Sequence, residues 1–196
     1  MAEFIDTLAI LLISVGMGIL LSALYFVFAA MGKINDARDK LAIPAMAIGF
    51  LNFIGGFVIS FTWPLPGGYN MLYGDPLLIF GLLLSTGSFM FYLGKDPSMM
   101  SILSFLLGIY VILGAYAMVV DHLEKGVNFL PAFVFYLFAG IGALLSPIVL
   151  VKPTGASKVL YYIEFIILVV ATFAALFIGY NAFLQHLVDF AHYFPA

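Results

Sequence analysis

The chain lacks cysteine and has few charged residues. The absence of cysteine excludes disulfides, thiolate zinc sites, iron–sulfur clusters and cysteine nucleophiles. Charged residues make up 9% of the 196 residues, whereas a soluble domain carries about 25%. The net charge is −3 and the sequence contains no basic stripe, so nucleic acid is excluded as a partner. Hydrophobic residues, by contrast, account for 65% of the chain, and the mean hydropathy is +1.19.

The hydrophobic residues are gathered in six long apolar segments. These span residues 4–31, 41–63, 76–94, 99–120, 129–151 and 159–187. Each segment is near or above the roughly 20 residues that a helix needs to cross hydrocarbon. Long blocks without alternation cannot be barrel strands, so the sequence predicts an all-α integral membrane protein with one transmembrane domain over 1–196. Asp75 and Asp96, each followed by proline, are predicted to cap the third and fourth helices.

Basic residues give a prediction of orientation. The connections after the first, third and fifth segments hold six of them: Lys33, Arg38, Lys40, Lys95, Lys152 and Lys158. All other connections and ends hold only Lys125. Because Lys and Arg accumulate on the cytoplasmic side, this pattern predicts a multi-pass protein of the cell membrane with both termini outside.

An internal repeat is suggested by Gly32-Lys33 after the first segment, Gly94-Lys95 after the third and Lys152 after the fifth. This spacing indicates three helical hairpins about 60 residues apart. Aligning the even-numbered helices superimposes two sets of residues: Gly49, Gly108 and Glu164, and then Gly56, Ala115 and Ala171. Small residues at such positions would let helices approach closely. Chance is the alternative, because glycine and alanine are common in this chain.

Glu164 is the most informative side chain, because it lies about a third of the way into the sixth segment. A charge at that depth is costly, so this carboxyl is expected to face protein or water. It could line a pore or carry a proton. Alternatively, it could be a protonated group that ties two helices together, or it could snorkel towards the membrane surface.

Several small polar residues could line the same path as Glu164. They are Ser14, Ser22, Asn52, Ser85, Thr86, Ser88 and Ser146. A path built from hydroxyls, one amide and one carboxyl suits a small neutral polar solute or protons. For each single serine, ordinary hydrogen bonding between helices is the competing interpretation.

The histidines His122, His186 and His192 all fall on the predicted outer side. They could sense pH, because histidine titrates near neutrality, or bind a metal with Asp121 and Asp189. They could also be solvated helix ends. We favour this interpretation because residues spaced three apart, such as His186, Asp189 and His192, drift around a helix and do not stay on one face. The absence of a histidine pair within the spans argues against haem. We therefore expect no cofactor and no metal.

The connection over residues 63–75 is aromatic, rich in turn formers and free of basic residues. It could be an interfacial belt or a folded cover over a pore mouth. The run from Thr62-Trp63-Pro64-Leu65-Pro66-Gly67 through Gly74-Asp75-Pro76 to Ile79-Phe80-Gly81-Leu82-Leu83 resembles a prokaryotic family of six-span membrane proteins with no assigned function.

A more distant resemblance is to the acid-gated urea channel and short-amide transporter family. It rests on Phe80-Gly81, Ile163-Glu164 and Gln185-His186. The resemblance implies a narrow path for urea-like solutes through each protomer of a homo-oligomeric ring. Two departures stand out: Trp63 is the only tryptophan, and the family's second carboxylate, in the fifth helix, is missing.

Together these observations predict a channel or facilitator for a small neutral polar solute. Its path would be lined by Glu164, Asn52, Phe80, Ser85 and Ser88. The alternative is a non-transporting structural or accessory subunit of a membrane complex. An enzyme is not expected, because the spans hold no nucleophile–base pair and no metal motif. The expected partners are membrane lipid, the solute and further copies of the chain.

Overall fold

A computed structural model describes residues 7–189. Within this part of the chain the regular elements are helices, with no strand among them. The helices are α1 (Thr7–Ala30), α2 (Ile34–Thr62), α3 (Asp75–Tyr92), α4 (Met100–Val120), α5 (Phe129–Leu145) and α6 (Ala156–Asp189). A π-helical turn, η1 (Asn70–Gly74), leads into α3, and 3-10 turns η2 (Gly126–Asn128) and η3 (Ser146–Leu150) flank α5. Six helical segments in this part of the chain are long and apolar enough to cross a membrane. The predicted all-α class and the number of helices are therefore confirmed.

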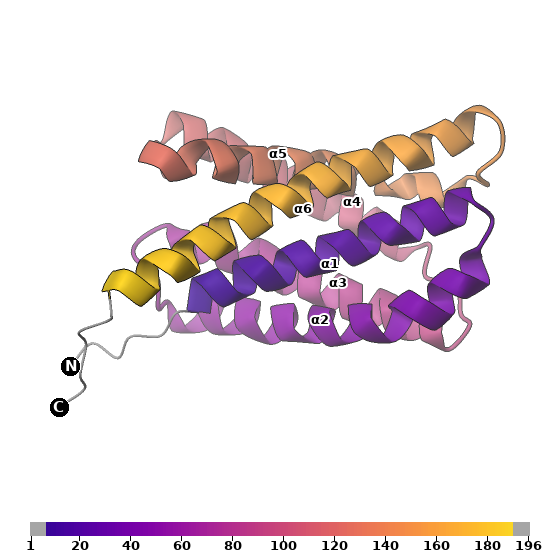
Figure 1. The fold of residues 1–196 in the computed structure, drawn as a ribbon, viewed down its shortest axis with the longest axis horizontal. Coiled ribbons are helices and arrows are strands. Elements are labelled where there is room, and N and C mark those ends of the chain that lie inside the picture. The colour runs from indigo at the N-terminus through magenta and orange to yellow at the C-terminus, as the bar shows by residue number, and fades with distance from the viewer. Residues whose placement is uncertain (1–6, 190–196) are drawn as a thin grey trace.

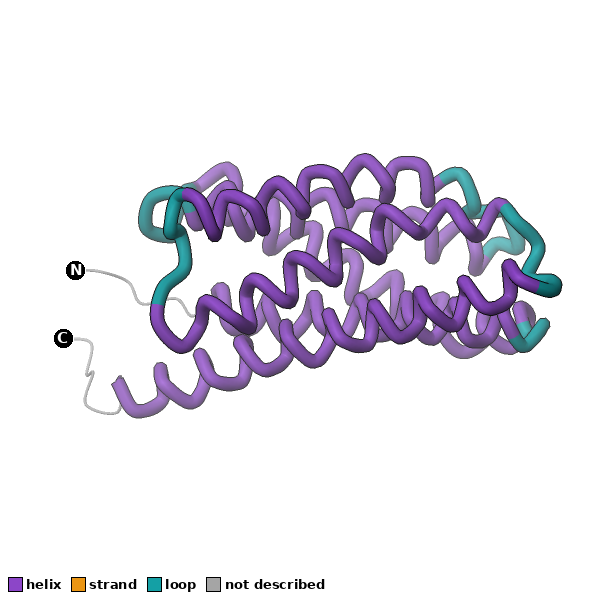
Figure 2. Tube along the Cα trace, turned by 90° about the horizontal axis from the view of Figure 1, so that it is seen from above, coloured by secondary structure: helices purple, strands orange, loops and turns teal. Residues whose placement is uncertain are grey.

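The helices run roughly along the long axis of the molecule, with loops gathered at its two ends (Figure 2). One end, called the basic end here, holds the connections after α1, α3 and α5. The other, called the distal end, holds the start of α1, the end of α6 and the connections after α2 and α4. In Figure 1, α1, α2 and α3 lie on one side, α4 and α5 on the other, and α6 crosses diagonally from the α5 side towards α1.

The two Gly-Lys pairs of the predicted repeat end α1 and α3 with the same backbone motif. Gly32 and Gly94 both adopt positive φ, at 73° and 69°. The amide of Lys33 donates to the Phe28 carbonyl at 2.9 Å, and the amide of Lys95 makes the equivalent bond to Met90 at 2.9 Å. These are Schellman motifs, which favour glycine because the left-handed conformation is strained for other residues. A third copy is absent from the described end of α5.

Two helix boundaries differ from the apolar pattern. Helix α2 begins at Ile34 rather than at 41, because the polar stretch after Lys33 contains no glycine or proline and continues as helix. Helix α5 ends at Leu145 rather than at 151, because Pro147 cannot donate a backbone hydrogen bond. The Ala143 carbonyl, which that bond would have satisfied, instead accepts the Ser146 hydroxyl at 2.8 Å.

The predicted caps of α3 and α4 are wrong in position. Asp75 is the first residue of α3 and follows η1 without interruption, so it caps nothing. Its carboxylate instead accepts a hydrogen bond from the Tyr110 hydroxyl at 3.1 Å. Asp96 accepts the Ser98 amide at 2.9 Å and so caps the turn before α4 rather than α4 itself.

The most extensive helix contacts pair α2 with α3, α1 with α6, and α4 with α5. In the first pair, a Cβ added at Gly49 would lie 2.6 Å from the backbone nitrogen of Ser85 and 3.1 Å from the carbonyl oxygen of Gly81. Real Cβ atoms do not approach this closely, so only glycine allows the two backbones to pack here. Hairpin partners joined at the basic end are in contact less extensively.

The α4–α5 pair repeats this contact with equivalent residues. A Cβ at Gly108 would lie 2.8 Å from the Leu144 nitrogen and 3.0 Å from the Gly140 carbonyl oxygen. Gly108 and Gly140 follow Gly49 and Gly81 at the same spacing in the sequence. The internal repeat is thus reflected in three-dimensional packing.

The α6–α1 pair has the same geometry, but not at the predicted residue. A Cβ at Gly179 would lie 3.0 Å from the Ile13 nitrogen and 3.2 Å from the Ala9 carbonyl oxygen. Gly179, rather than Glu164, is therefore the structural equivalent of Gly49 and Gly108. The three pairs form a ring of close contacts in which the last helix packs against the first.

Candidate functional site

The inner surfaces of all six helices surround a cavity of about 280 Å³. Its wall follows α3 for the whole length of that helix. The α3 residues on the wall are Pro76, Leu77, Phe80, Leu83, Leu84, Gly87, Ser88 and Phe91. This spacing of three and four residues is one face of a helix. The cavity is therefore long and narrow, and it runs between the two ends of the bundle.

The polar residues on the wall are gathered towards the basic end. They are Ser22, Tyr25, Ser88, Ser98, Ser101, Ser104, Ser146 and Glu164. Towards the distal end the polar lining residues are Tyr73 and Tyr136. The hydroxyls of both tyrosines donate to groups outside the cavity. The wall is thus polar at one end and apolar or aromatic along the rest.

Glu164 lies on this wall with 1% of its surface exposed. Neither of its carboxyl oxygens has a hydrogen-bond partner among residues 7–189. Gly142 of α5 lies beside the carboxyl: an added Cβ would be 3.4 Å from Glu164 Oε1, an ordinary contact distance, and 2.5 Å from Leu168 Cδ2. Gly49 and Gly108, which the predicted repeat aligns with Glu164, leave no space for its carboxyl, because both glycines pack against backbone. No described residue supports the alternative of a hydrogen-bonded tie between helices.

Two serines on the polar part of the wall have their hydroxyl hydrogens engaged by backbone. Ser101 donates to the Ser98 carbonyl at 2.6 Å, and Ser146, whose shorter bond is the one to the Ala143 carbonyl, also lies 3.1 Å from the Ser101 carbonyl oxygen. A hydroxyl that donates in this way keeps lone pairs with which it can accept. This end of the cavity therefore offers acceptors and one carboxyl.

The other predicted path residues fall into two groups. Phe80 and Ser88 line the cavity. Asn52 and Ser85 do not line it. The Asn52 amide nitrogen lies 3.5 Å from the Ser14 carbonyl oxygen, and the Ser85 hydroxyl lies 3.5 Å from that of Met46. Both lie where helices meet, as the interpretation of ordinary interhelical contacts predicts.

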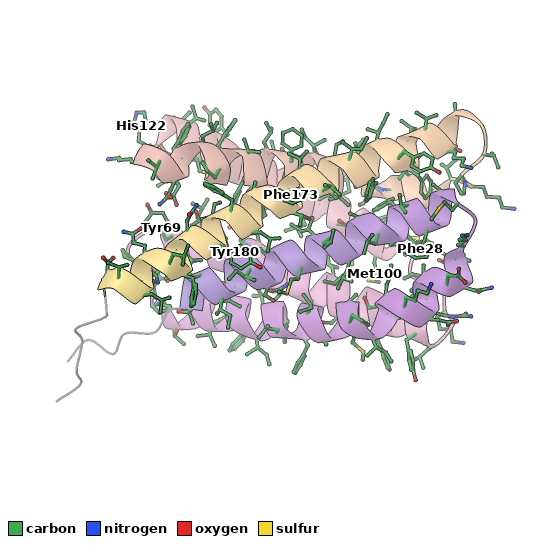
Figure 3. The ribbon with its side chains drawn as sticks, in the orientation of Figure 1. Phe28, Tyr69, Met100, His122, Phe173 and Tyr180 are labelled. Atoms are coloured by element: carbon green, nitrogen blue, oxygen red, sulfur yellow. The ribbon has the colours of Figure 1, made fainter. Side chains whose placement is uncertain are left out.

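Neither His122 nor His186 is among the residues that line the cavity. His122 is exposed at the distal end, where its φ of 50° turns the chain after α4 (Figure 3). His186 is partly buried in the last turn of α6. His192 lies outside the described residues. Within residues 7–189, no group of three histidine or acidic side chains is placed to hold a metal.

Residues 63–74, called the distal cap here, are folded around one buried amide. Asn70 is fully buried. Its carbonyl oxygen accepts the Leu65 amide at 2.8 Å, and its nitrogen donates to the carbonyls of Leu65 and Gly67, at 2.5 Å and 3.0 Å. A single side chain therefore satisfies three backbone groups. The connection is a folded structure rather than an open loop.

Tyrosines tie the distal cap to the α4–α5 connection. The Tyr69 hydroxyl donates to the Leu123 carbonyl at 2.7 Å, and the Tyr73 hydroxyl donates to Glu124 Oε1 at 2.6 Å. Burial, with a smaller contribution from the Glu124 carboxylate, raises the pKa of Tyr69, so this hydroxyl remains a donor at neutral pH.

The Tyr73 and Tyr136 rings, together called the distal closure here, form part of the wall at the distal end of the cavity. They meet edge to face with centroids 5.9 Å apart, and the Tyr136 hydroxyl donates to the Leu72 carbonyl. Sequence reasoning missed this closure, because its partners come from distant segments and carry no local motif.

This fold and site define a class: a six-helix protein with the length and apolar composition of a membrane protein, built around a cavity with one buried carboxyl. The chain belongs to the family described as "Protein of unknown function (DUF981)", whose model matches residues 1–189. No curated protein and no solved structure matches the chain. This match confirms one part of the predicted resemblance, namely that the chain belongs to a family without assigned function.

Proposed function

We propose that the protein is a membrane channel or facilitator whose solute moves along the central cavity and meets Glu164. One observation carries this proposal: a fully buried carboxyl, without a partner among the described residues, faces a cavity whose wall follows α3 from end to end. An ionisable group in a membrane helix is expensive, so its presence points to a functional role. A structural role would call for a bonded partner.

The resemblance to the urea channel and short-amide transporter family adds support. Phe80 and Glu164, two of the residues that carry the resemblance, both lie on the cavity wall. A solute passing from the basic end would meet hydroxyl acceptors and Glu164 first, and then the aromatic distal part. The Tyr73–Tyr136 closure would act as the gate that it must open.

The proposal is tested with purified protein in liposomes and two substitutions of Glu164. Glu164→Leu removes both charge and hydrogen bonding, and should lower the flux of a permeant solute at least about tenfold, equivalent to ~1.4 kcal/mol. Glu164→Gln keeps the shape and should retain much of the flux of a neutral solute such as urea or acetamide. Asp121→Asn, an exposed carboxylate outside the cavity, is the matched control and should leave the flux unchanged.

The competing function is a non-transporting subunit of a membrane complex. It predicts a folded protein that makes liposomes no more permeable than protein-free vesicles to any solute of a broad panel. It also predicts that Glu164→Leu alters the melting temperature without a selective effect on flux. Either result would reject the channel.

We also propose that the basic end faces the cytoplasm, which would place both termini outside. The support is the segregation of six of the seven Lys and Arg residues to that end. An epitope tag at either terminus should be labelled on intact cells. Labelling that requires permeabilisation would reverse the orientation.

A further inference from the structure

We infer that the cavity binds an organic cation with an apolar body, its charged head beside Glu164 and its body extending towards Tyr73 and Tyr136. This inference rests on the proposed function and names the class of solute. It follows from the charge, the aromatic side chains and the uneven polarity of the cavity wall.

The charge on the wall has one sign. Among the lining residues within 7–189, Glu164 is the only acidic residue, and none of them is Lys, Arg or His. The other ionisable groups there are the phenols of Tyr25 in α1, Tyr73 in η1 and Tyr136 in α5; α2 and α4 contribute none. An isolated carboxylate in apolar surroundings is costly unless a cation or a proton balances it. A cationic ligand supplies that balance, whereas an anion would find no partner.

Aromatic rings gather one helical turn from Glu164, on the side of the basic end. Tyr161 precedes Glu164 by one helical turn, and its ring meets that of Phe26 edge to face at 5.8 Å. Tyr25 joins this group through edge contacts with Phe26 at 5.7 Å and Phe91 at 5.6 Å. Phe26, Tyr25 and Phe91 also line the cavity. Ring faces attract ammonium groups, most strongly where water is excluded.

The rest of the wall favours an apolar body over a compact polar solute. Between Glu164 and the distal closure the lining is apolar, made of leucine, isoleucine, valine, alanine, proline and phenylalanine, and the hydroxyls of Tyr73 and Tyr136 already donate elsewhere. A urea-like molecule would find no hydrogen-bond partners in this region, so it could pass through but would bind there only weakly. A quaternary ammonium group needs no hydrogen bond, and an attached apolar group would be buried against this surface.

The test is equilibrium binding of benzyltrimethylammonium to the full chain in lipid nanodiscs. The neutral isostere neopentylbenzene has the same shape without the charge, and phenylacetate carries the opposite charge. We expect the wild type to bind the cation more tightly than either. Glu164→Gln should weaken cation binding at least about thirtyfold, because it removes one partner of a desolvated charge pair. Binding of neopentylbenzene should change little, and Asp121→Asn should bind the cation as the wild type does.

The wild-type comparison keeps the test decisive even if Glu164→Gln fails to fold, because it needs no substitution. Equal or tighter binding of the neutral isostere would overturn the inference, as would undiminished cation binding by a folded Glu164→Gln protein. The two proposals can fail separately. Cation binding through Glu164 without any solute flux would reject the channel and keep the cation site. Urea flux that depends on Glu164, without cation binding, would reject the cation site and keep the channel.

Discussion

Gly49 of α2 packs so closely against Ser85 of α3 that a Cβ on Gly49 would lie 2.6 Å from the Ser85 backbone nitrogen. The same relationship joins Gly108 to Leu144 at 2.8 Å. Since backbone cannot move aside as a flexible side chain can, these positions accept no side chain without separating the helices.

Gly49→Ala and Gly108→Ala should each destabilise the protein by about 1–3 kcal/mol, the usual cost of overpacking a well-packed interior. Thermal unfolding in detergent, followed by circular dichroism, measures the effect. Gly87→Ala is the matched control, because its added methyl would meet only Met100 at an ordinary 3.6 Å. A control that is as destabilising as the two test variants would show that the loss arises from helix propensity or cavity filling instead.

The amide of Asn70 should be necessary for the folded distal cap. Asn70→Ala leaves the Leu65 amide and two carbonyls without their partner, at a cost of about 1–3 kcal/mol. Trp63, the only tryptophan, lies in the cap and reports on it directly. Its fluorescence should become more accessible to a soluble quencher in Asn70→Ala. Thr62→Val removes an exposed hydroxyl that bonds only within α2 and should leave quenching unchanged.

Loss of the Tyr73 hydroxyl should loosen the distal closure. Tyr73→Phe keeps the ring but removes the 2.6 Å bond to Glu124. A hydrogen bond to a charged group contributes about 1.5–3 kcal/mol, so opening should become roughly tenfold or more favourable. Solute flux in liposomes should rise accordingly. Tyr116→Phe changes a tyrosine that is 64% exposed on α4 and serves as control. Equal flux in both variants would mean that the closure does not limit transport.

The pH-sensing role of the three histidines remains a prediction, which can be tested by measuring flux as a function of pH. If they sense pH, flux should change between about pH 5 and 7, where histidine ordinarily titrates. Replacing His122, His186 and His192 together with glutamine should then flatten the profile. The exposed position of His122 away from the cavity wall fits a solvated helix end better. A profile that is identical in the triple variant would establish that interpretation.

The sequence was sufficient for the six helices because long apolar blocks allow little else in a membrane. It was insufficient for the start of α2, where the helix includes a polar stretch outside the apolar block and Arg38 donates a hydrogen bond to Asn35 Oδ1 at 3.2 Å. Composition marks where hydrocarbon would end, but a helix can continue into polar surroundings.

The site was predicted in part for a similar reason. The cost of a buried charge was enough to predict that Glu164 faces protein or water rather than lipid. Its neighbour Gly142 could not be predicted, because the packing of α5 against α6 is a tertiary relationship. Asn52 and Asn70 illustrate the same limit. Both amides are fully buried, yet one lies where α1 meets α2 and the other organises a connection.

The pairing of α6 with α1 has a consequence for the order of assembly. The face of α1 around Ala9 and Ile13, which Gly179 approaches, has its partner in the last helix of the chain. During synthesis α2 can find α3, and α4 can find α5, as soon as each neighbour emerges. Helix α1 must wait until α6 has been made, so the cavity can be enclosed only after α6 has been inserted.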